Sequence, residues 1–459
     1  MRVTCIRIGL RPMLVLAALV LQTQRVCAND LLDFYHLALT RDAVLQAATY
    51  QRDAAIEVRP QALSQLLPQI SATGSATREN IDYAASYEGL HAPDCTLSAD
   101  ASTQHCYGTT HGLGLTLTQT LWSYQAFSLL KEANSQAAAA EATWQGAREN
   151  LLLRAALAYF AILSASDQLV TNRHAREAFS TLLNQAKTRE TIGVWAHNDV
   201  EQAQSFYDAT EQSVIDAQNA LDDANLALTE MIGPHPEAIA PLQETIPLVS
   251  PEPASADEWV ASARQDNFDV RAAQLKVEAA ERDISAQRGK ALPTFSLTGS
   301  GSKAWQDEIL GGNQSLNTVG VSFSWPLFQS GAVASAVRQS RALYRQAQAL
   351  YDTAQRDTER QTRSAFRDVV SGVQRITAAR RAVASGHDAV EGSRRNVEFG
   401  TGSVFDLLNA QNNYYAAQRA YSQTRYDYLT ALLTLKQQAG RLAEHDLEMI
   451  DALLVAHGS

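Results

Sequence analysis

Two stretches of the chain repeat an apolar residue at every seventh position, and they stand 207 positions apart. Each begins and ends at a glycine. A seven-residue apolar repeat places one stripe on an α-helix and favours a supercoiled partner helix. Small residues three places after most repeat positions let that partner approach closely. The pattern predicts a tandem duplication of a long helical hairpin, with repeat positions Val200, Tyr207, Val214, Leu221 and Leu228, then Leu407, Tyr414, Tyr421, Tyr428 and Leu435.

Four short segments alternate between apolar and small polar residues instead. Leu113, Leu115 and Leu117, for example, alternate with glycine and threonine. A two-residue period predicts β-strands with one apolar face and one small, polar face. Two interpretations stay open on this pattern: the apolar face packs on a soluble core, or it faces lipid. The predicted strands lie near 70–77, 112–118, 295–299 and 319–325.

The remaining pattern is helical, and proline marks where helices stop. Leu67-Pro68 and Leu292-Pro293 each end a helix, because proline lacks an amide donor and restrains the residue before it. Ser255 and Glu258 have the spacing of a capping box. The longest helix would reach about 100 Å at 1.5 Å per residue. We expect helices over about 31–63, 124–189, 255–291 and from beyond 328 to about 398, with a polar loop over 78–110.

Composition supports long helices rather than thick globular cores. Charged residues make up 19% and aromatic residues 7% of the 459 residues, while the apolar content is mostly Ala, Leu and Val. The net charge of −11 argues against a nucleic-acid partner and is compatible with a lumen that prefers cations. We expect four parts: a signal peptide (1–28), a first repeat (29–240), a Pro-rich linker (241–254) and a second repeat (255–459).

The N-terminus reads as an export signal, with Arg2, Arg7 and Arg11 before a short apolar run and small residues near Ala28. No other segment approaches the roughly 20 apolar residues of a membrane helix. A mature protein that crosses a membrane would therefore use strands. Four strands cannot close a barrel, and open edges are not tolerated in lipid. Sister copies would complete the barrel. Three copies, which give twelve strands, are the natural count for a wide pore, although the sequence also allows two or four.

Export to an oxidising space favours a disulfide between Cys95 and Cys106. The rival interpretation is a metal site, since His91, His105 and His111 are close in sequence. The polar composition of the loop favours the disulfide, and we expect no metal or cofactor.

Enzymatic chemistry has no candidate site in the sequence. It contains no Gly-rich phosphate loop, no nucleophile elbow and no paired-His metal motif. His174 and His197 are interpreted as solvated side chains. A periplasmic coiled-coil adaptor or scaffold is a candidate function, as an alternative to a protein that crosses the membrane with its strands. Such an adaptor would not need two strand pairs with an apolar face.

Several motifs, in order and in duplicate, resemble the TolC family of outer-membrane efflux and secretion channels over essentially the whole mature chain. They are Leu67-Pro68-Gln69-Ile70, Leu292-Pro293-Thr294-Phe295, Gly320-Val-Ser-Phe-Ser-Trp-Pro-Leu-Phe-Gln-Ser-Gly331, and Gly400 followed by Val404-Phe405-Asp406-Leu407-Leu408-Asn409-Ala410. The resemblance implies an α+β membrane protein: a homotrimer whose twelve-stranded barrel in outer-membrane lipid continues into a periplasmic α-helical barrel. It also implies an equatorial belt at the linker.

The same resemblance implies the function of an exit duct. A periplasmic adaptor and an inner-membrane RND, ABC or MFS pump would deliver substrate, in drug efflux or in type I secretion. The segment around Cys95 and Cys106 would lie on the cell exterior.

The resemblance places the periplasmic entrance at the helix tips, around 191–199 and 400–409. Asp406 matches the first gate aspartate of the family, whereas Asn409 stands at the second acidic position and would weaken cation block. Three Asp406 carboxylates around one axis would attract cations.

At the positions of a tyrosine and an arginine that tie the tips in the family's best-studied member, this chain has Val397 and Gly402. Their partners correspond to Asn198 and Asp199, so the closed state must be held differently or less firmly; Glu190, Arg394 and Arg395 are candidate substitutes.

Simpler structural roles compete with gating. A carboxylate in the first turn of a helix is favoured by the exposed amides, which suits both Asp199 and Asp406. Gly193 and Gly400 are predicted helix C-caps, and adaptor contact at these exposed tips is a compatible second role. The tyrosines at 414, 421 and 428 are interpreted as packing between helices rather than a track for ligands.

Overall fold

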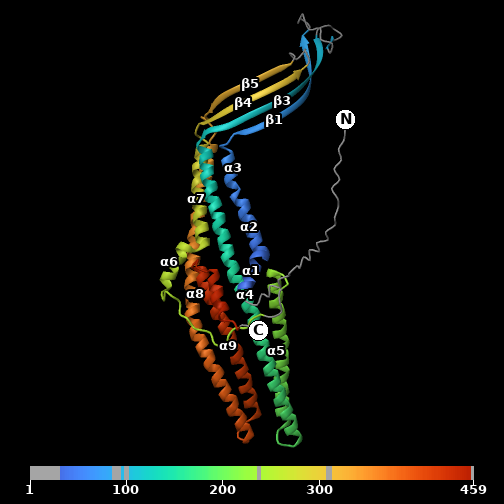
Figure 1. Ribbon diagram of the computed structural model, residues 1–459, viewed down its shortest axis with the longest axis vertical. Coiled ribbons are helices and arrows are strands. Elements are labelled where there is room, and N and C mark those ends of the chain that lie inside the picture. The colour runs from blue at the N-terminus through green and yellow to red at the C-terminus, as the bar shows by residue number, and fades with distance from the viewer. Residues whose placement is uncertain (1–30, 85–94, 98–102, 235–238, 307–312, 456–459) are drawn as a thin grey trace, which may run out of the picture.

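A computed structural model describes residues 31–84, 95–97, 103–234, 239–306 and 313–455. Long helices run side by side, with one antiparallel sheet at one end and two helical hairpin tips at the other (Figure 1). The predicted signal peptide and His91 lie outside the described residues. Among the helices in the described ranges, none is long and apolar enough to cross a membrane.

Two helical hairpins form the long axis of the molecule. In the first, α4 (Tyr124–Thr191) returns as α5 (His197–Ile232), and in the second α8 (Ala332–Glu398) returns as α9 (Val404–Gln438). The predicted long helices are confirmed to within two residues at three of these ends. α4 begins where the Ser123 hydroxyl accepts the Ala126 amide, a cap that satisfies one otherwise unpaired donor.

The seam of the second hairpin pairs glycines with tyrosines. A Cβ placed on Gly372 would lie 3.2 Å from the ring of Tyr428, and one on Gly386 would lie 3.3 Å from Cα of Tyr414. Glycine thus lets α8 approach α9 over the bulky rings, and Tyr428 is almost fully buried. The interpretation of the tyrosines as packing residues is confirmed at these two positions.

Each repeat opens with helices that are shorter than predicted. The expected helix over 31–63 is three helices, and the expected helix over 255–291 is two. Both predictions of one continuous helix were wrong, because Asp42 and Asn267 adopt extended backbone and cap the helix that follows, accepting the amides of Leu45 and Val270. The observed elements are α1 (Leu31–Arg41), α2 (Ala43–Ile56), α3 (Val58–Ser64), α6 (Ala256–Asp266) and α7 (Phe268–Gly289).

The predicted capping box at Ser255 was also wrong. Ser255 does stand at the start of α6, but its side chain makes no capping hydrogen bond. The linker before it contains no helix or strand in its described residues, apart from a single β-bridge between Leu242 and Leu454. A short helix, α10 (Glu444–Asp451), precedes Leu454 and lies beside α1.

The sheet is larger than the alternating residues predicted. Its antiparallel strands follow the order β1-β3-β4-β5, and β2 pairs with β3. The prediction of a polar loop over 78–110 was wrong for much of its length. The hydrogen-bonded pairing of β1 with β3 continues through this segment, but its polar and apolar side chains do not alternate and so gave no strand signal. The strands are β1 (Gln69–Ala84), β2 (Cys95–Leu97), β3 (Thr103–Ser123), β4 (Thr294–Gln306) and β5 (Gln314–Ser324).

Register keeps the two faces of this sheet distinct. Leu115 stands opposite Ala72 on one side and Gly301 on the other, whereas Thr116 stands opposite Ser71 and Ser300. Because strand side chains alternate, the apolar residues share one face and the hydroxyls share the other.

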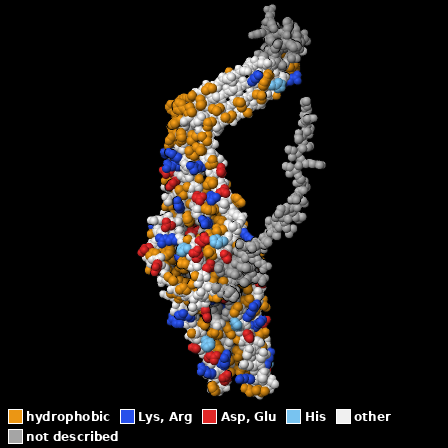
Figure 2. Space-filling view, in the orientation of Figure 1, with side chains coloured by type: hydrophobic (Ala, Val, Ile, Leu, Met, Phe, Trp, Pro, Cys, Tyr) orange, Lys and Arg blue, Asp and Glu red, His pale blue; other side chains and the backbone are white. Residues whose placement is uncertain are grey.

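The apolar face carries solvent-exposed residues, with Val319 85% exposed. Figure 2 shows hydrophobic side chains gathered over the part of the sheet next to the helices. On the opposite face Ser300 and Thr318 form a hydroxyl pair 2.6 Å apart.

The main hydrophobic core lies midway along the molecule, where α1, α10 and the linker pack against α4, α5, α8 and α9. Its largest fully buried side chains include Phe34, Tyr35, Tyr159 and Tyr428. A second, smaller core lies near the hairpin tips.

Candidate functional site at the helix tips

Both hairpin tips turn through the same backbone motif. Gly193 and Gly400 have φ of +72° and +71°, a conformation that favours glycine. The amide of Gly193 donates to Glu190 O and that of Val194 to Arg189 O, while Gly400 and Thr401 repeat these bonds to Val397 O and Asn396 O. This is the Schellman arrangement, which satisfies the last carbonyls of a helix. The predicted C-caps are confirmed.

In the first tip, Asp199 and His197 hold the start of α5. Asp199 Oδ2 accepts the Ala196 amide at 3.0 Å, so its carboxylate serves as a helix N-terminal cap. The ring of His197 pairs with Glu190 at 2.7 Å, which joins the end of α4 to the start of α5. The hydrogen bond that the protonated ring donates to Glu190 raises the pKa of His197, and the charge of Glu201 adds to the effect. Asn198 is exposed.

His197 was predicted to be merely solvated. It is indeed exposed, but the structure gives it a partner that the sequence interpretation missed. Its seven-residue spacing from Glu190 across a predicted glycine turn was the available signal. Glu190, offered as a substitute for the absent closed-state contacts, is engaged within its own tip.

The second tip is held by one carbonyl and one cap. Asn396 O accepts the amides of Thr401 and Gly402 at 2.8 and 3.0 Å. A Cβ on Gly402 would lie 2.7 Å from Cβ of Asn396, so this tight turn requires glycine. The Ser403 hydroxyl accepts the Asp406 amide and donates to Asp406 Oδ2 at 2.7 Å. Asp406 therefore has the predicted first-turn role.

Asn409 faces its own helix rather than a partner across the tips. Its side-chain amide donates to Phe405 O at 3.1 Å. Within the described chain, no hydrogen bond or ion pair joins the first tip to Asp406 or Asn409. Arg394 pairs with Glu391 on the same helix. The two tips are instead joined by the smaller apolar core, which contains Val397 beside Val200, Val404, Leu407, Leu408 and Phe179.

A polar cluster above the tips joins the two hairpins, and the sequence interpretation missed it. Asp167 of α4 accepts hydrogen bonds from Ser422 (2.6 Å), Arg425 (3.0 Å) and Tyr426 (2.9 Å) of α9. Burial raises the pKa of Tyr426, and the neighbouring Asp167 carboxylate raises it further. A carboxylate within the apolar helix run near Leu163 and Leu169 was the only sequence signal.

The same face of α9 fastens the linker. Arg425 donates to the carbonyls of Gln243 and Glu244, and the Tyr421 hydroxyl donates to Glu244 O. The Tyr428 hydroxyl accepts the Val249 amide and donates to Val249 O. Two of the heptad tyrosines therefore anchor the linker with their hydroxyls while their rings pack in the seam.

The cysteines lie far from the tips, at the distal end of the sheet. Cys106 is disulfide-bonded, and Cys95 stands directly opposite it in the ladder between β2 and β3. This register supports the predicted pairing. His105 pairs with Asp82 at 2.5 Å rather than with a metal cluster, and the described residues contain no group of three or more candidate ligands placed to hold a metal ion.

Comparison with known proteins places these features in a family. The family model described as outer membrane efflux protein matches residues 34–234 and 259–441, which fall within the two predicted repeats. The outer membrane protein TolC of Vibrio cholerae is 28% identical over 448 residues, covering 96% of this chain and 98% of the relative. The alkaline protease secretion protein AprF of Pseudomonas aeruginosa is 28% identical over 445 residues, covering 96% and 90%.

Solved structures share the fold. The outer membrane protein VceC of Vibrio cholerae has a TM-score of 0.74 at 20% identity, covering 89% of this chain and 96% of that one. The open state of the MtrE outer membrane channel of Neisseria gonorrhoeae has a TM-score of 0.73 at 19% identity, covering 91% and 90%.

Proposed function

Because the chain belongs to the outer membrane efflux protein family and is an outer-membrane exit duct for efflux or type I secretion, we propose that three copies build one tube, entered through the helix tips. The duct lies in the outer membrane and extends into the periplasm. The rival function of a periplasmic scaffold is set aside, since the family is one of channels.

The observation that carries the threefold assembly is the open sheet. β1 and β5 are its outer strands, and within the described residues neither has a strand partner on its outer edge. Unpaired backbone groups are not tolerated in lipid, so the exposed apolar face requires that these edges be covered. Pairing β5 of each copy with β1 of the next closes a barrel, and three copies supply twelve long strands. Leu115 and Val319 then face lipid, and Thr116 faces the lumen.

The entrance is proposed to lie at the tips, where Asp406 of each copy would approach the common axis. Asp406 is exposed and has no cation partner among the residues described, so its charge is available to passing ions. Asn409 leaves the second position neutral. Asp199 caps α5 and Gly402 shapes the opposite turn, so both contribute to the entrance by positioning backbone.

Adaptor docking is proposed at the outer surface of the same tips. Ile192, Val194 and Phe399 flank Gly193 and Gly400 and are strongly exposed, with Phe399 79% exposed. Apolar side chains so exposed at the end of a hairpin suit a protein partner. A periplasmic adaptor served by an inner-membrane RND, ABC or MFS pump fits this position.

Conductance across planar bilayers tests the entrance. We expect purified wild-type protein to give small, cation-preferring channels. Asp406→Asn keeps an acceptor for the Ser403 hydroxyl but removes the charge, so cation preference should fall and conductance should change. Asp406→Ala should raise conductance if the acidic ring restricts the entrance. Asp216→Asn, which removes an exposed carboxylate on α5, is the matched control. Unchanged conductance and selectivity in both Asp406 variants would remove that residue from the entrance.

A further inference from the structure

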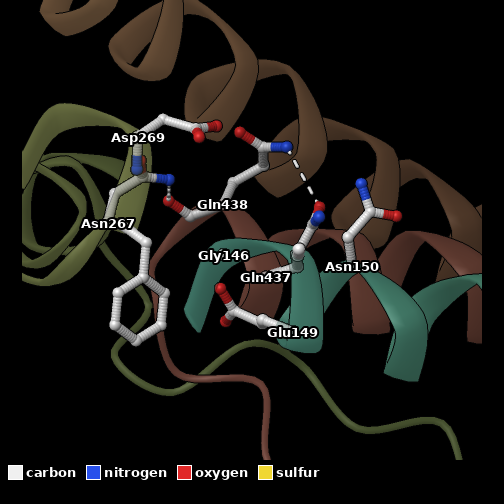
Figure 3. Close-up of a pocket in the computed structure, with 9 residues that line it drawn as sticks. Gly146, Glu149, Asn150, Asn267, Asp269, Gln437 and Gln438 are labelled. Carbon is white, nitrogen blue, oxygen red and sulfur yellow. Dashed lines mark hydrogen bonds between the residues drawn. The ribbon is translucent and has the colours of Figure 1, made fainter. Parts of the chain in front are cut away.

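A polar cavity of about 230 Å³ lies where α4, the start of α7 and the end of α9 meet. Figure 3 shows the carboxylates of Glu149 and Asp269 on its walls, with the side-chain amides of Asn150, Gln437 and Gln438 around them. The cavity is far from the helix tips along the chain and belongs to neither the sheet nor the seam.

Glu149 is a buried carboxylate, and only one of its two oxygens accepts a hydrogen bond from the described residues. Its side chain is part of a residue that is only 7% exposed. Oε1 accepts the Leu442 amide at 3.1 Å, and Oε2 has no hydrogen-bond partner among the described residues, although the residue lines the cavity. Burial, with a smaller contribution from Asp269, raises the pKa of Glu149 to about 7, although the hydrogen bond from the Leu442 amide opposes this shift. An ionised Glu149 therefore needs a positive charge beside it.

Three cations close in sequence to the residues that line the cavity make other contacts. Arg148 is bonded to Tyr35, Lys436 pairs with the buried Asp446, and Arg441 lies over the ring of Trp259. Within the part of the chain that the structure describes, neither Glu149 nor Asp269 forms an ion pair. The buried Glu149 and the exposed Asp269 thus line one cavity, and neither has an ion-pair partner among the described residues.

In the first repeat, a cation lies beside the turn that corresponds to Gly440. Gly233 and Gly440 stand at matching positions after α5 and α9, and each adjoins the junction between two N-terminal helices of a repeat. At Gly233 the guanidinium of Arg41, the last residue of α1, donates to Ile232 O at 3.0 Å. At Gly440 the last residue of α6 is Asp266, whose carbonyl lies against the glycine. The Arg41 guanidinium therefore lies beside the turn in the first repeat, whereas a backbone carbonyl lies beside the corresponding turn in the second.

We propose that this cavity binds a small organic cation, a guanidinium or a primary ammonium group, between Glu149 and Asp269. Oε2 of Glu149 and the Asp269 carboxylate would accept its N–H groups, and the amide oxygens of Asn150 and Gln437 would accept the remainder. Guanidinium suits several acceptors around one cavity, because its donors fan out in a plane. The inference does not depend on the proposed function of the duct.

Calorimetric titration of the purified full-length protein with methylguanidinium, at low salt and pH 8, tests the proposal. Glu149→Gln keeps the acceptor for the Leu442 amide, and Asp269→Asn keeps a polar residue in the first turn of α7. We expect each variant to bind at least about tenfold more weakly, as loss of one charge-assisted bond implies. Asp388→Asn removes an equally charged but exposed carboxylate from α8 and should bind as wild type does.

Lowering the pH provides a second readout. With the pKa of Glu149 at about 7, its ionised fraction falls about tenfold between pH 8 and pH 6, and affinity should fall with it. Asp269 faces Glu149 from α7, while Gln437 and Gln438 of α9 carry no charge.

Titration with N-acetyl-arginine amide separates two sources of the cation. Binding of both probes points to an arginine of a protein partner, and binding of methylguanidinium alone points to a free metabolite; either supports the site. Equal affinity in wild type and Glu149→Gln would overturn it, as would binding of Mg²⁺ with no binding of either guanidinium.

Discussion

Gly289 is expected to be the least replaceable helical glycine in the chain. It is the last residue of α7 and is buried where α7 crosses the first turn of α4, directly beneath the sheet. A Cβ at this position would lie 2.7 Å from both N and Cα of Gln125. Ordinary contacts to a Cβ are 3.4 Å or longer, so the two backbones would have to separate by about 0.7 Å. Overpacking of this kind costs about 1–3 kcal/mol.

Helix propensity acts in the opposite direction. Replacing glycine by alanine inside a helix gains up to about 1 kcal/mol, and less in a last turn. Gly289→Ala should therefore destabilise the fold by about 1–2 kcal/mol. Gly392→Ala is the matched control, because Gly392 lies inside α8 and, apart from its chain neighbours and the nearby backbone of its own helix, no atom of the described residues lies within 4 Å of an added Cβ. It should stabilise by up to about 1 kcal/mol.

Thermal melting of the two variants in detergent, followed by far-ultraviolet circular dichroism, compares them directly. We expect Gly289→Ala to melt below wild type and Gly392→Ala at or above it. Equal shifts of the same sign would show that propensity alone governs both sites. The close approach of α7 to α4 would then make no difference to the stability of the Gly289→Ala variant.

Three further outcomes follow from two buried polar contacts and one tight turn. Asp167→Ala removes the carboxylate that pairs with Arg425 and accepts the Tyr426 hydroxyl, and it should cost about 3 kcal/mol in chemical denaturation, with Asp167→Asn costing less. Glu149 has a folded pKa of about 7, above its ordinary value of 4.5, so its contribution is most favourable below about pH 4.5 and is lost as pH rises through 7. Glu149→Gln should therefore raise the melting temperature at pH 8 and change it less at pH 5. A Gly402→Arg variant should loosen the second tip, seen as faster proteolysis there, because its Cβ would meet Asn396.

The long helices and their turns could be predicted from sequence because their signals are local. Seven-residue periodicity fixes the buried stripe, and a glycine after the last periodic residue supplies the positive φ that ends the helix. Gly193 and Gly400 carry both signals, and the structure places each at a tip.

The breaks at Asp42 and Asn267 could not be predicted in the same way. Asp42 is held by Arg154, 112 residues away in sequence, and Asn267 by the carbonyl of Gln438. Each interrupts a helix whose local propensity is continuous, so the tertiary partner decides. The distal hairpin shows the same limit, since its ladder is set by pairing across Glu79 and Gly108 rather than by alternation.

The candidate site was predicted in part for a similar reason. Asp199 and Asp406 follow a helix-start pattern that sequence displays. Asp167 and Glu149 matter because distant helices converge on them, and a single carboxylate in a helical run carries no sign of that convergence. The resemblance to a family supplied the tips but not the contacts that hold them.

The part of α4 between Asp167 and its tip forms a long arm. α4 is tied to α9 at Asp167, and the helix continues for 24 residues to Thr191. That arm is about 36 Å long at 1.5 Å per residue. A rotation of only about 10° about Asp167 would displace the tip by about 6 Å, roughly the rise of one helical turn. Such a movement leaves the backbone hydrogen bonds of both helices intact, so its energetic cost is set by the smaller apolar core that joins the two tips.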